Sequence, residues 1–221
     1  MKWEIEHHGV ALIRNLIDMP TRDAVISALG AITTAGRRGL LGVPVVAELA
    51  RSPQIVGLIR PHLPAEPIPV RAIYFDKSPD ANWFVGWHQD LTIALRARTE
   101  VPGFGLWTVK DGIPHVQPPV ELLEQMLTVR LHLDDADASN GALRVLPGLH
   151  RSGILSSGRM DELAASQSEV LCAAAAGDVL LMRPLLLHAS SRSKSERRRR
   201  VLHIEYAGFT LPAGLNWHEA A

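Results

Sequence analysis

The sequence predicts an α+β chain with a β-sandwich or barrel core and helices at its N-terminal end. The prediction comes from one change of pattern along the 221 residues. Apolar side chains first recur at helical spacing, and from residue 67 onward short β-type runs alternate with turn signals. No internal repeat or linker interrupts the chain, so we expect one domain, residues 1–221, with a helical flank at 1–66 and a β core at 67–210.

The helical flank opens with a short apolar strand and continues with three helices. Proline marks the start of each helix, where its missing N–H has no intrahelical partner to lose. After the third helix, the proline-rich stretch 62–69 predicts a loop. The expected elements are a strand at 9–14 and helices at 20–34, 45–50 and 53–60.

The β core consists of short strands separated by Gly, Pro, Asn and Asp. Asn140-Gly141 is a strong signal for a tight turn, because both residues tolerate positive φ. A short helix is expected at 161–166. The expected strands lie at 70–76, 83–93 (one or two), 126–134, 142–146, 170–174, 178–182, 185–190 and 199–208.

The segment 97–119 stands apart because it is long, irregular and rich in Gly and Pro. Loops of this length are usually functional lids or disordered. Phe104 and Trp107 supply large apolar anchors, which favours an ordered lid. We therefore predict that 97–119 covers a substrate site and that Trp107 contacts the substrate.

The bulk composition argues against several classes of partner. The formal net charge is zero and the pI is about 7.2, which disfavours general binding to nucleic acid or to a membrane surface. A single cysteine, Cys172, cannot form an intrachain disulfide, and no apolar stretch reaches membrane-spanning length. The N-terminus lacks the apolar core of a signal peptide. We expect a cytoplasmic monomer or homodimer whose partner is a small molecule.

A candidate metal site begins in the segment Trp87-His88-Gln89-Asp90. On a strand, side chains two residues apart point to the same face, so His88 and Asp90 can meet one metal ion. A second histidine from another strand would complete a 2-His-1-carboxylate triad with open coordination positions. That arrangement is typical of non-haem Fe(II) oxygenases.

Two other pairs share this spacing, so the pair must be chosen from its context. His132 and Asp134 end a strand that leads into the Asn140 turn, which predicts a strand-end role for the carboxylate. His203 and Glu205 lie near the C-terminal end of the sequence, where only His218 follows.

His188 is the better third ligand for His88 and Asp90. It lies at the end of an apolar segment that begins at Gly177 and that predicts two buried strands. A histidine at the end of an apolar strand is by itself more often a core residue than a ligand. The metal assignment therefore depends on a wider pattern.

Three blocks supply that pattern, and together they resemble the phytanoyl-CoA dioxygenase family of Fe(II)- and 2-oxoglutarate-dependent enzymes. The blocks are Trp87–Asp90, Leu133–His150 and Gly177–Tyr206, in the family's order, and the likeness covers nearly the whole chain. The resemblance implies a double-stranded β-helix (jelly-roll, cupin-like) core flanked by the N-terminal helices.

The resemblance also implies the site. Fe(II) would be held by His88, Asp90 and His188, with 2-oxoglutarate and O2 as cosubstrates. Arg199, eleven residues after His188, would take the distal carboxylate of 2-oxoglutarate with help from Ser190. For the other three arginines of the run 197–200 we expect a solvated edge or basic patch.

The implied reaction is hydroxylation of an aliphatic C–H bond. The carboxylate of Asp90 favours hydroxylation over halogenation, because related halogenases have a small residue at that position. No catalytic residue beyond the metal ligands is expected, since the iron chemistry needs no protein base.

The remaining polar residues are therefore candidates for substrate binding. Arg71 and Lys77 share one strand face, and Arg130 lies with its neighbours Thr128 and His132 on another. If these faces line the barrel, the substrate is anionic; otherwise Lys77 and Arg130 are outward charges.

Two other functions stay open at this stage. One is a cupin-like metalloenzyme that does not use 2-oxoglutarate. The other is a β-sandwich binding module without catalysis, against which the intact ligand set argues.

Overall fold

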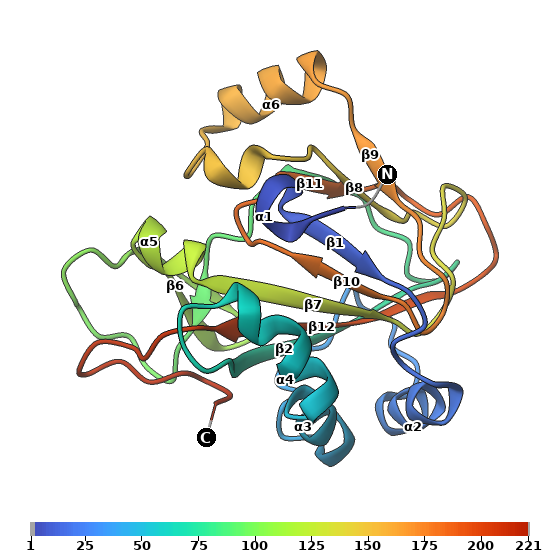
Figure 1. The fold of residues 1–221 in the computed structure, drawn as a ribbon, viewed down its shortest axis with the longest axis horizontal. Helices are drawn as coiled ribbons and strands as arrows, with labels where there is room; N and C mark the ends of the chain where they lie inside the picture. The colour runs from blue at the N-terminus through green and yellow to red at the C-terminus, as the bar shows by residue number, and fades with distance from the viewer. Residues whose placement is uncertain (1–2, 221) are drawn as a thin grey trace.

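The computed structural model describes residues 3–220, and its strands form three antiparallel sheets (Figure 1). The first sheet has the order β1-β10-β7-β12-β2, the second β3-β11-β8-β9 and the third β4-β6-β5. The helices are α1 Ile5–His8, α2 Met19–Leu29, α3 Pro44–Ala50, α4 Pro53–Ile59, α5 Val120–Glu124 and α6 Ser157–Ser166, with 3-10 turns at Arg60–His62 and Leu149–Arg151. The strands are β1 Val10–Ile13, β2 Ile68–Lys77, β3 Val85–His88, β4 Ile93–Ala94, β5 Gly105–Lys110, β6 Ile113–Gln117, β7 Met126–His132, β8 Leu143–Val145, β9 Val170–Cys172, β10 Val179–Met182, β11 His188–Ser190 and β12 Arg199–Ala207.

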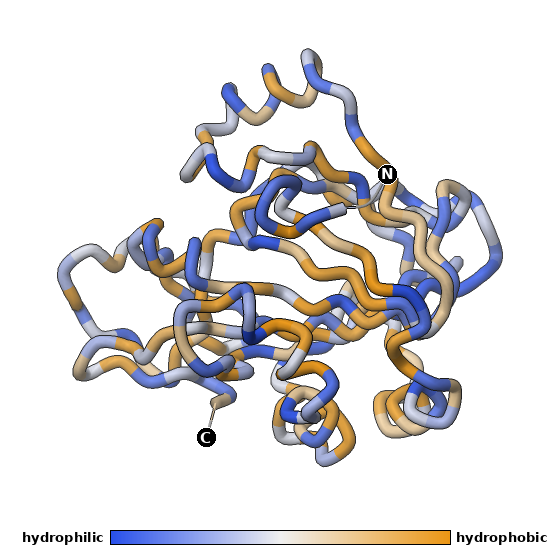
Figure 2. Tube along the Cα trace, in the orientation of Figure 1, coloured by the Kyte–Doolittle hydropathy of each residue, from blue (hydrophilic) through white to orange (hydrophobic). Residues whose placement is uncertain are grey.

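Helices α2, α3 and α4 cover one face of the five-stranded sheet (Figure 1). Alternate residues of its strands point to this layer, such as Leu127, Val129 and Leu131 of β7. They pack against helix residues such as Val25 and Ile55, which are fully buried. Figure 2 shows long apolar stretches along the central strands, whereas the loops mix polar and apolar segments.

The opposite face of the five-stranded sheet meets the four-stranded sheet. Leu180 and Met182 of β10 pack against Leu143, Val145 and Cys172 of the second sheet. The α+β class and the helical flank are therefore confirmed. Within residues 3–220, no helix is long and apolar enough to cross a membrane.

The helix starts follow the predicted signals, but the first helix ends earlier than expected. The Asp18 side chain caps α2 by accepting from the Thr21 N–H at 2.9 Å, and Ser52 caps α4 in the same way. The prediction of helix over 20–34 is wrong beyond Leu29, because Gly30 takes a φ of 64° and ends the helix.

The segment 97–119 has more regular secondary structure than predicted. Strands β5 and β6 form a hairpin, which β4 extends into the third sheet. The turn residues Asp111 and Gly112 have φ values of 52° and 78°, as a tight hairpin turn requires. This Asp-Gly signal was present in the sequence, so the expectation of an irregular stretch is corrected.

Candidate metal centre and anion pocket

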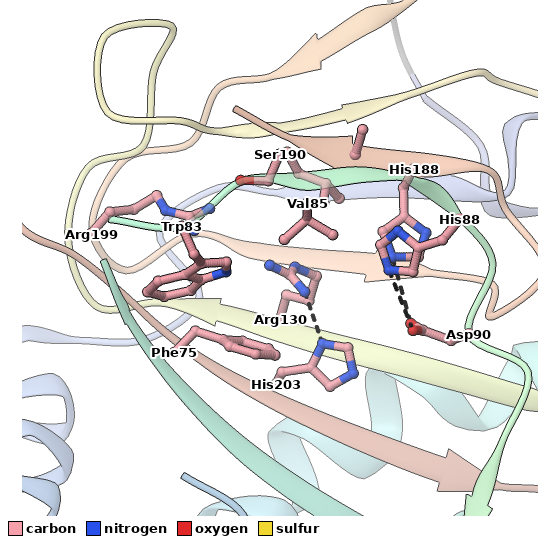
Figure 3. A pocket seen from close by; sticks show the side chains of 12 residues that line it. Phe75, Trp83, Val85, His88, Asp90, Arg130, His188, Ser190, Arg199 and His203 are labelled. Atoms are coloured by element: carbon pink, nitrogen blue, oxygen red, sulfur yellow. Dashed lines mark hydrogen bonds and ion pairs between the residues drawn. The ribbon is translucent and has the colours of Figure 1, made fainter. Parts of the chain in front are cut away.

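Two neighbouring strands bring the three predicted metal ligands together. His88 at the end of β3 pairs with His188 at the start of β11, and their ring centroids lie 4.1 Å apart. Asp90 follows β3, where its backbone N–H donates to the Pro184 carbonyl at 2.9 Å. Its Oδ1 lies 3.9 Å from His88 Nε2, and its Oδ2 lies 3.7 Å from His188 Nε2 (Figure 3). Ligand atoms from all three residues thus lie within 4.8 Å of one another.

Backbone carbonyls fix which ring nitrogen of each histidine faces the carboxylate. His88 Nδ1 lies 2.9 Å from the Gly86 carbonyl, and His188 Nδ1 lies 2.8 Å from the Leu186 carbonyl. A carbonyl oxygen can only accept, so each Nδ1 carries the proton and donates it. The Nε2 lone pairs are left free to face Asp90, and this is the arrangement found in metal-ligating histidines.

The protonation states also suit a metal ion. Burial lowers the pKa of His188 to about 3, so its imidazole is neutral at pH 7. Burial would raise the pKa of Asp90, but the nearby histidines and Arg71 outweigh it and hold the carboxyl below its usual range. Asp90 Oδ2 is buried without a hydrogen-bond partner among residues 3–220. A neutral imidazole and an unpaired carboxylate oxygen are ligand forms that suit a divalent iron ion.

Arg199 lies at the other end of the same cavity. It starts β12 opposite Lys77 of β2, and its side chain is 3% exposed. Its Nε and Nη1 are buried with no partner in the described part of the chain. The neighbouring arginines instead each pair with an acid: Arg197 with Asp137, Arg198 with Asp76 and Arg200 with Asp134. The expected basic patch is therefore a set of ion pairs, and Arg199 alone of the four lines the cavity.

Lys77 and Ser190 lie beside Arg199. The Lys77 ammonium donates to Ser190 Oγ at 3.1 Å and to the Ser191 carbonyl at 2.6 Å, and it lies 5.0 Å from the Trp83 ring. The absence of a side chain at Gly141 leaves room for the Ser191 carbonyl, because a Cβ at this position would lie 2.3 Å from the Ser191 oxygen. Burial and the charge of Arg199 lower the pKa of Lys77 to about 7. Buried cations in such proximity favour an anion between them.

The three cations predicted to bind substrate have different surroundings. Arg71 is bound to Glu205 of β12 and does not line the cavity. Lys77 is held at the Ser190 end, as described above. Arg130 lines the cavity, with one nitrogen bonded to His203. The sequence left open whether Lys77 and Arg130 face inward or outward; of the three cations, only Arg130 is open to a ligand in the centre.

The two competing histidine–carboxylate pairs do not form metal sites. The ring nitrogens of His132 are buried, whereas the Asp134 carboxylate accepts hydrogen bonds from Nε and Nη2 of Arg200. His203 accepts a hydrogen bond from Arg130, and Glu205 forms an ion pair with Arg71. Within residues 3–220, His88, Asp90 and His188 are the one group of this kind whose ligand atoms converge.

Several residues that line the cavity were missed in the sequence. Phe75 shares the inward face of β2 with Lys77, and His203 shares that of β12 with Arg199, so an even-spacing pattern could have found both. Trp83 precedes β3 and Val85 begins it, and neither carried such a signal. Trp107 does not line the cavity; it packs on an apolar cluster around Phe104, with Arg98 over its ring at 5.7 Å.

Comparisons with known proteins agree with this geometry. The model of the phytanoyl-CoA dioxygenase (PhyH) family matches residues 21–201. A probable alpha-ketoglutarate-dependent hypophosphite dioxygenase from Stutzerimonas stutzeri is 27% identical in an alignment over 176 residues that covers 73% of this chain and 52% of that protein. The chain thus spans about half the length of this curated relative.

Solved structures share the fold at low identity. HygX from Streptomyces hygroscopicus, with nickel and 2-oxoglutarate bound, has a TM-score of 0.66 at 18% identity over 92% of this chain and 84% of that chain. The apoform of EctD from S. alaskensis has a TM-score of 0.71 at 18% identity, covering 98% and 82% of the two chains. These values show a common architecture.

Proposed function

The chain belongs to the phytanoyl-CoA dioxygenase family of 2-oxoglutarate-dependent non-haem iron dioxygenases, and we propose that it hydroxylates an aliphatic C–H bond of a small anionic metabolite. We also propose that its two facing sheets form the double-stranded β-helix of that family as one domain. The observation that carries the proposal is one cavity with two ends: three converging ligand atoms at one end and the unpaired Arg199 at the other.

The two ends of the cavity bind different groups in this proposal. His88, Asp90 and His188 hold Fe(II), and Arg199 with Ser190 takes the distal carboxylate of 2-oxoglutarate. When bound, iron with 2-oxoglutarate and O2 supplies the oxidising power for hydroxylation, and 2-oxoglutarate leaves as succinate and CO2. Phe75 and Trp83 form aromatic walls of the cavity.

The relative's name supports an anionic substrate. Hypophosphite is a small anion, and the cavity here contains more cationic than anionic side chains. Hypophosphite carries P–H rather than C–H bonds, so it belongs in the first substrate screen beside small carboxylates. The segment 97–119 is proposed as the cover of the mouth.

The test measures iron content and succinate together. The protein is loaded anaerobically with Fe(II), mixed with 2-oxoglutarate and the screen compounds, and exposed to O2. We expect succinate from the wild-type protein and loss of both iron and succinate in His88→Ala, Asp90→Ala and His188→Ala.

A matched control separates the site from general damage. His132→Ala and Asp134→Ala remove the competing pair and should leave the iron content unchanged. If the control variants lose iron and His188→Ala does not, the assigned site is wrong. Iron binding with product but without succinate would favour a metalloenzyme that does not use 2-oxoglutarate, and absence of iron binding would favour a binding module.

A further inference from the structure

We propose that Arg130 binds the anionic group of the substrate and that this group carries one negative charge. The inference rests on the proposed function and deepens it, because it names the residue and the charge that select the substrate. Arg130 lies on β7, 6% exposed, and its guanidinium projects into the cavity between Arg199 and the metal ligands (Figure 3).

The contacts of Arg130 fix its position but do not neutralise it. Its Nη1 lies 2.8 Å from His203 Nδ1, and its guanidinium carbon lies 5.8 Å from the centre of the Phe75 ring. Its Nε is buried without a partner among the residues that the structure describes. A buried cation that contacts an imidazole and a phenyl ring still needs an anion.

Glu205, the acid that His203 links to Arg130, is already paired with another cation. Arg130 can only donate, so His203 Nδ1 accepts and the ring proton is on Nε2, which donates to Glu205 Oε1 at 3.2 Å. Burial lowers the pKa of His203 more than Glu205 raises it, which keeps the ring neutral. Glu205 also forms an ion pair with Arg71. The Arg71–Glu205 pair therefore has no net charge, and the charge of Arg130 remains.

A charge balance over the loaded cavity gives the charge of the substrate. Fe(II), Asp90, the two carboxylates of 2-oxoglutarate and Arg199 together have no net charge. Lys77 is bonded to Ser190 and to the Ser191 carbonyl and does not line the cavity, so its charge is left out of the balance. What remains at pH 8 is the single positive charge of Arg130, which one negative charge on the substrate would offset.

The position of Arg130 also restricts the substrate's length. Arg130 and the three metal ligands line one cavity, which must hold 2-oxoglutarate as well. A substrate anchored on Arg130 therefore presents a bond close to its anionic group. The expected class is a short monoanionic oxyanion, either a carboxylate or a tetrahedral sulfur or phosphorus oxyanion.

The experiment compares ligands that differ in charge and shape. Propionate, the neutral isostere propionamide and the tetrahedral anion methanesulfonate are titrated by calorimetry at pH 8 into anaerobic protein loaded with Fe(II) and 2-oxoglutarate. We expect the wild-type protein to bind at least one anion about 30-fold more tightly than propionamide, and the better anion identifies the oxyanion shape. Equal affinity for propionate and propionamide, or no binding of either anion, would overturn the proposal.

Variants then assign the effect to Arg130. Arg130→Met should lose the preference for the anion, while Arg130→Lys should retain it with weaker binding because the planar fork is lost. The control Arg197→Met removes an exposed arginine that pairs with Asp137 and should change nothing. Circular dichroism verifies the fold, and the wild-type charge comparison stands even if Arg130→Met does not fold.

The visible absorption of the anaerobic Fe(II)–2-oxoglutarate complex distinguishes failure of this proposal from failure of the proposed function. If the wild-type protein gives no such band, the function itself is wrong. If Arg130→Met weakens the band and leaves anion binding intact, Arg130 serves the cosubstrate and the inference is wrong.

Discussion

Replacement of Arg199 by methionine should weaken 2-oxoglutarate binding and at the same time stabilise the unloaded protein. Methionine keeps much of the side-chain length but removes a guanidinium that is 3% exposed and has two nitrogens unpartnered within residues 3–220. In the loaded protein that guanidinium would bind the distal carboxylate. In the unloaded protein the same charge is buried beside Arg130, and burial with this repulsion lowers its pKa to about 9.

The two effects have different magnitudes. A charge-assisted contact in a desolvated pocket contributes about 2–5 kcal/mol, and we take about 3 because Lys77, which contacts Ser190, remains beside the site in the variant. At about 1.4 kcal/mol per tenfold, this gives a roughly 100-fold rise in the dissociation constant of 2-oxoglutarate. Replacing an unmatched buried charge by an apolar side chain should stabilise the unloaded protein by about 1–4 kcal/mol.

Lys77 makes the loss dependent on pH. Burial and Arg199 lower its pKa to about 7, so removing Arg199 removes one of the two causes and the pKa rises. More of the ammonium form is then present at a given pH, and its fraction grows as the pH falls. The loss of 2-oxoglutarate affinity in Arg199→Met should therefore be smaller at pH 6 than at pH 8.5.

The assays are anaerobic titration of the Fe(II)–2-oxoglutarate absorption band and thermal unfolding of the metal-free protein. Arg197→Met is the matched control, since its side chain is about half exposed, and should change affinity by within about 0.5 kcal/mol. Equal loss of affinity in both variants would show that the run acts as a general basic patch. A lower Tm for metal-free Arg199→Met would contradict the account of an unmatched buried charge.

Three other predictions follow from the same structure. The stability of the metal-free protein should fall as the pH drops from about 10.5 to about 7, because Lys77 is protonated in the unfolded chain before it is protonated in the folded chain. Lys77→Met should flatten this part of the curve of Tm against pH, and an unchanged slope would contradict the lowered pKa of Lys77. His203→Phe should raise the KM for substrate more than it lowers kcat, because Arg130 loses its acceptor, and a loss of kcat alone would oppose a positioning role. If 97–119 is a lid, substrate should protect it from limited proteolysis and Trp107→Ala should lower kcat/KM; no change in either would leave it as a hairpin pinned to the core.

Local sequence signals determined the elements and much of the site. Alternation along β2 placed Arg71 and Lys77 on a common face, because successive side chains of a strand point to opposite sides. The spacing of two residues also paired His88 with Asp90, although β3 ends at His88 and Asp90 follows it. Caps and prolines fixed the helix starts, as at Asp18 and Pro53. The long segment 97–119 was misjudged, since its Asp-Gly turn is a stronger local signal than its overall Gly and Pro content.

The tertiary structure alone decided which of these residues meet. His188 lies opposite His88 because of the register between β3 and β11, and neither strand's sequence encodes that register by itself. Arg197 and Arg199 share an even spacing, but β12 begins at Arg199, so only the latter is held on the inward face while Arg197 reaches Asp137. Ion pairing across strands, which depends on distant neighbours, determines whether a buried charge is matched.

Arg71 and Arg130 illustrate that last point. Both were predicted to bind an anionic substrate, and both lie inward with nearly equal exposure, 7% and 6%. Glu205 on β12 pairs with Arg71, whereas the register between β12 and β7 sets the neutral His203 opposite Arg130. The sequence thus supplied two similar cations, and the pairing of their neighbouring strands left only one of them with a charge that a ligand can match.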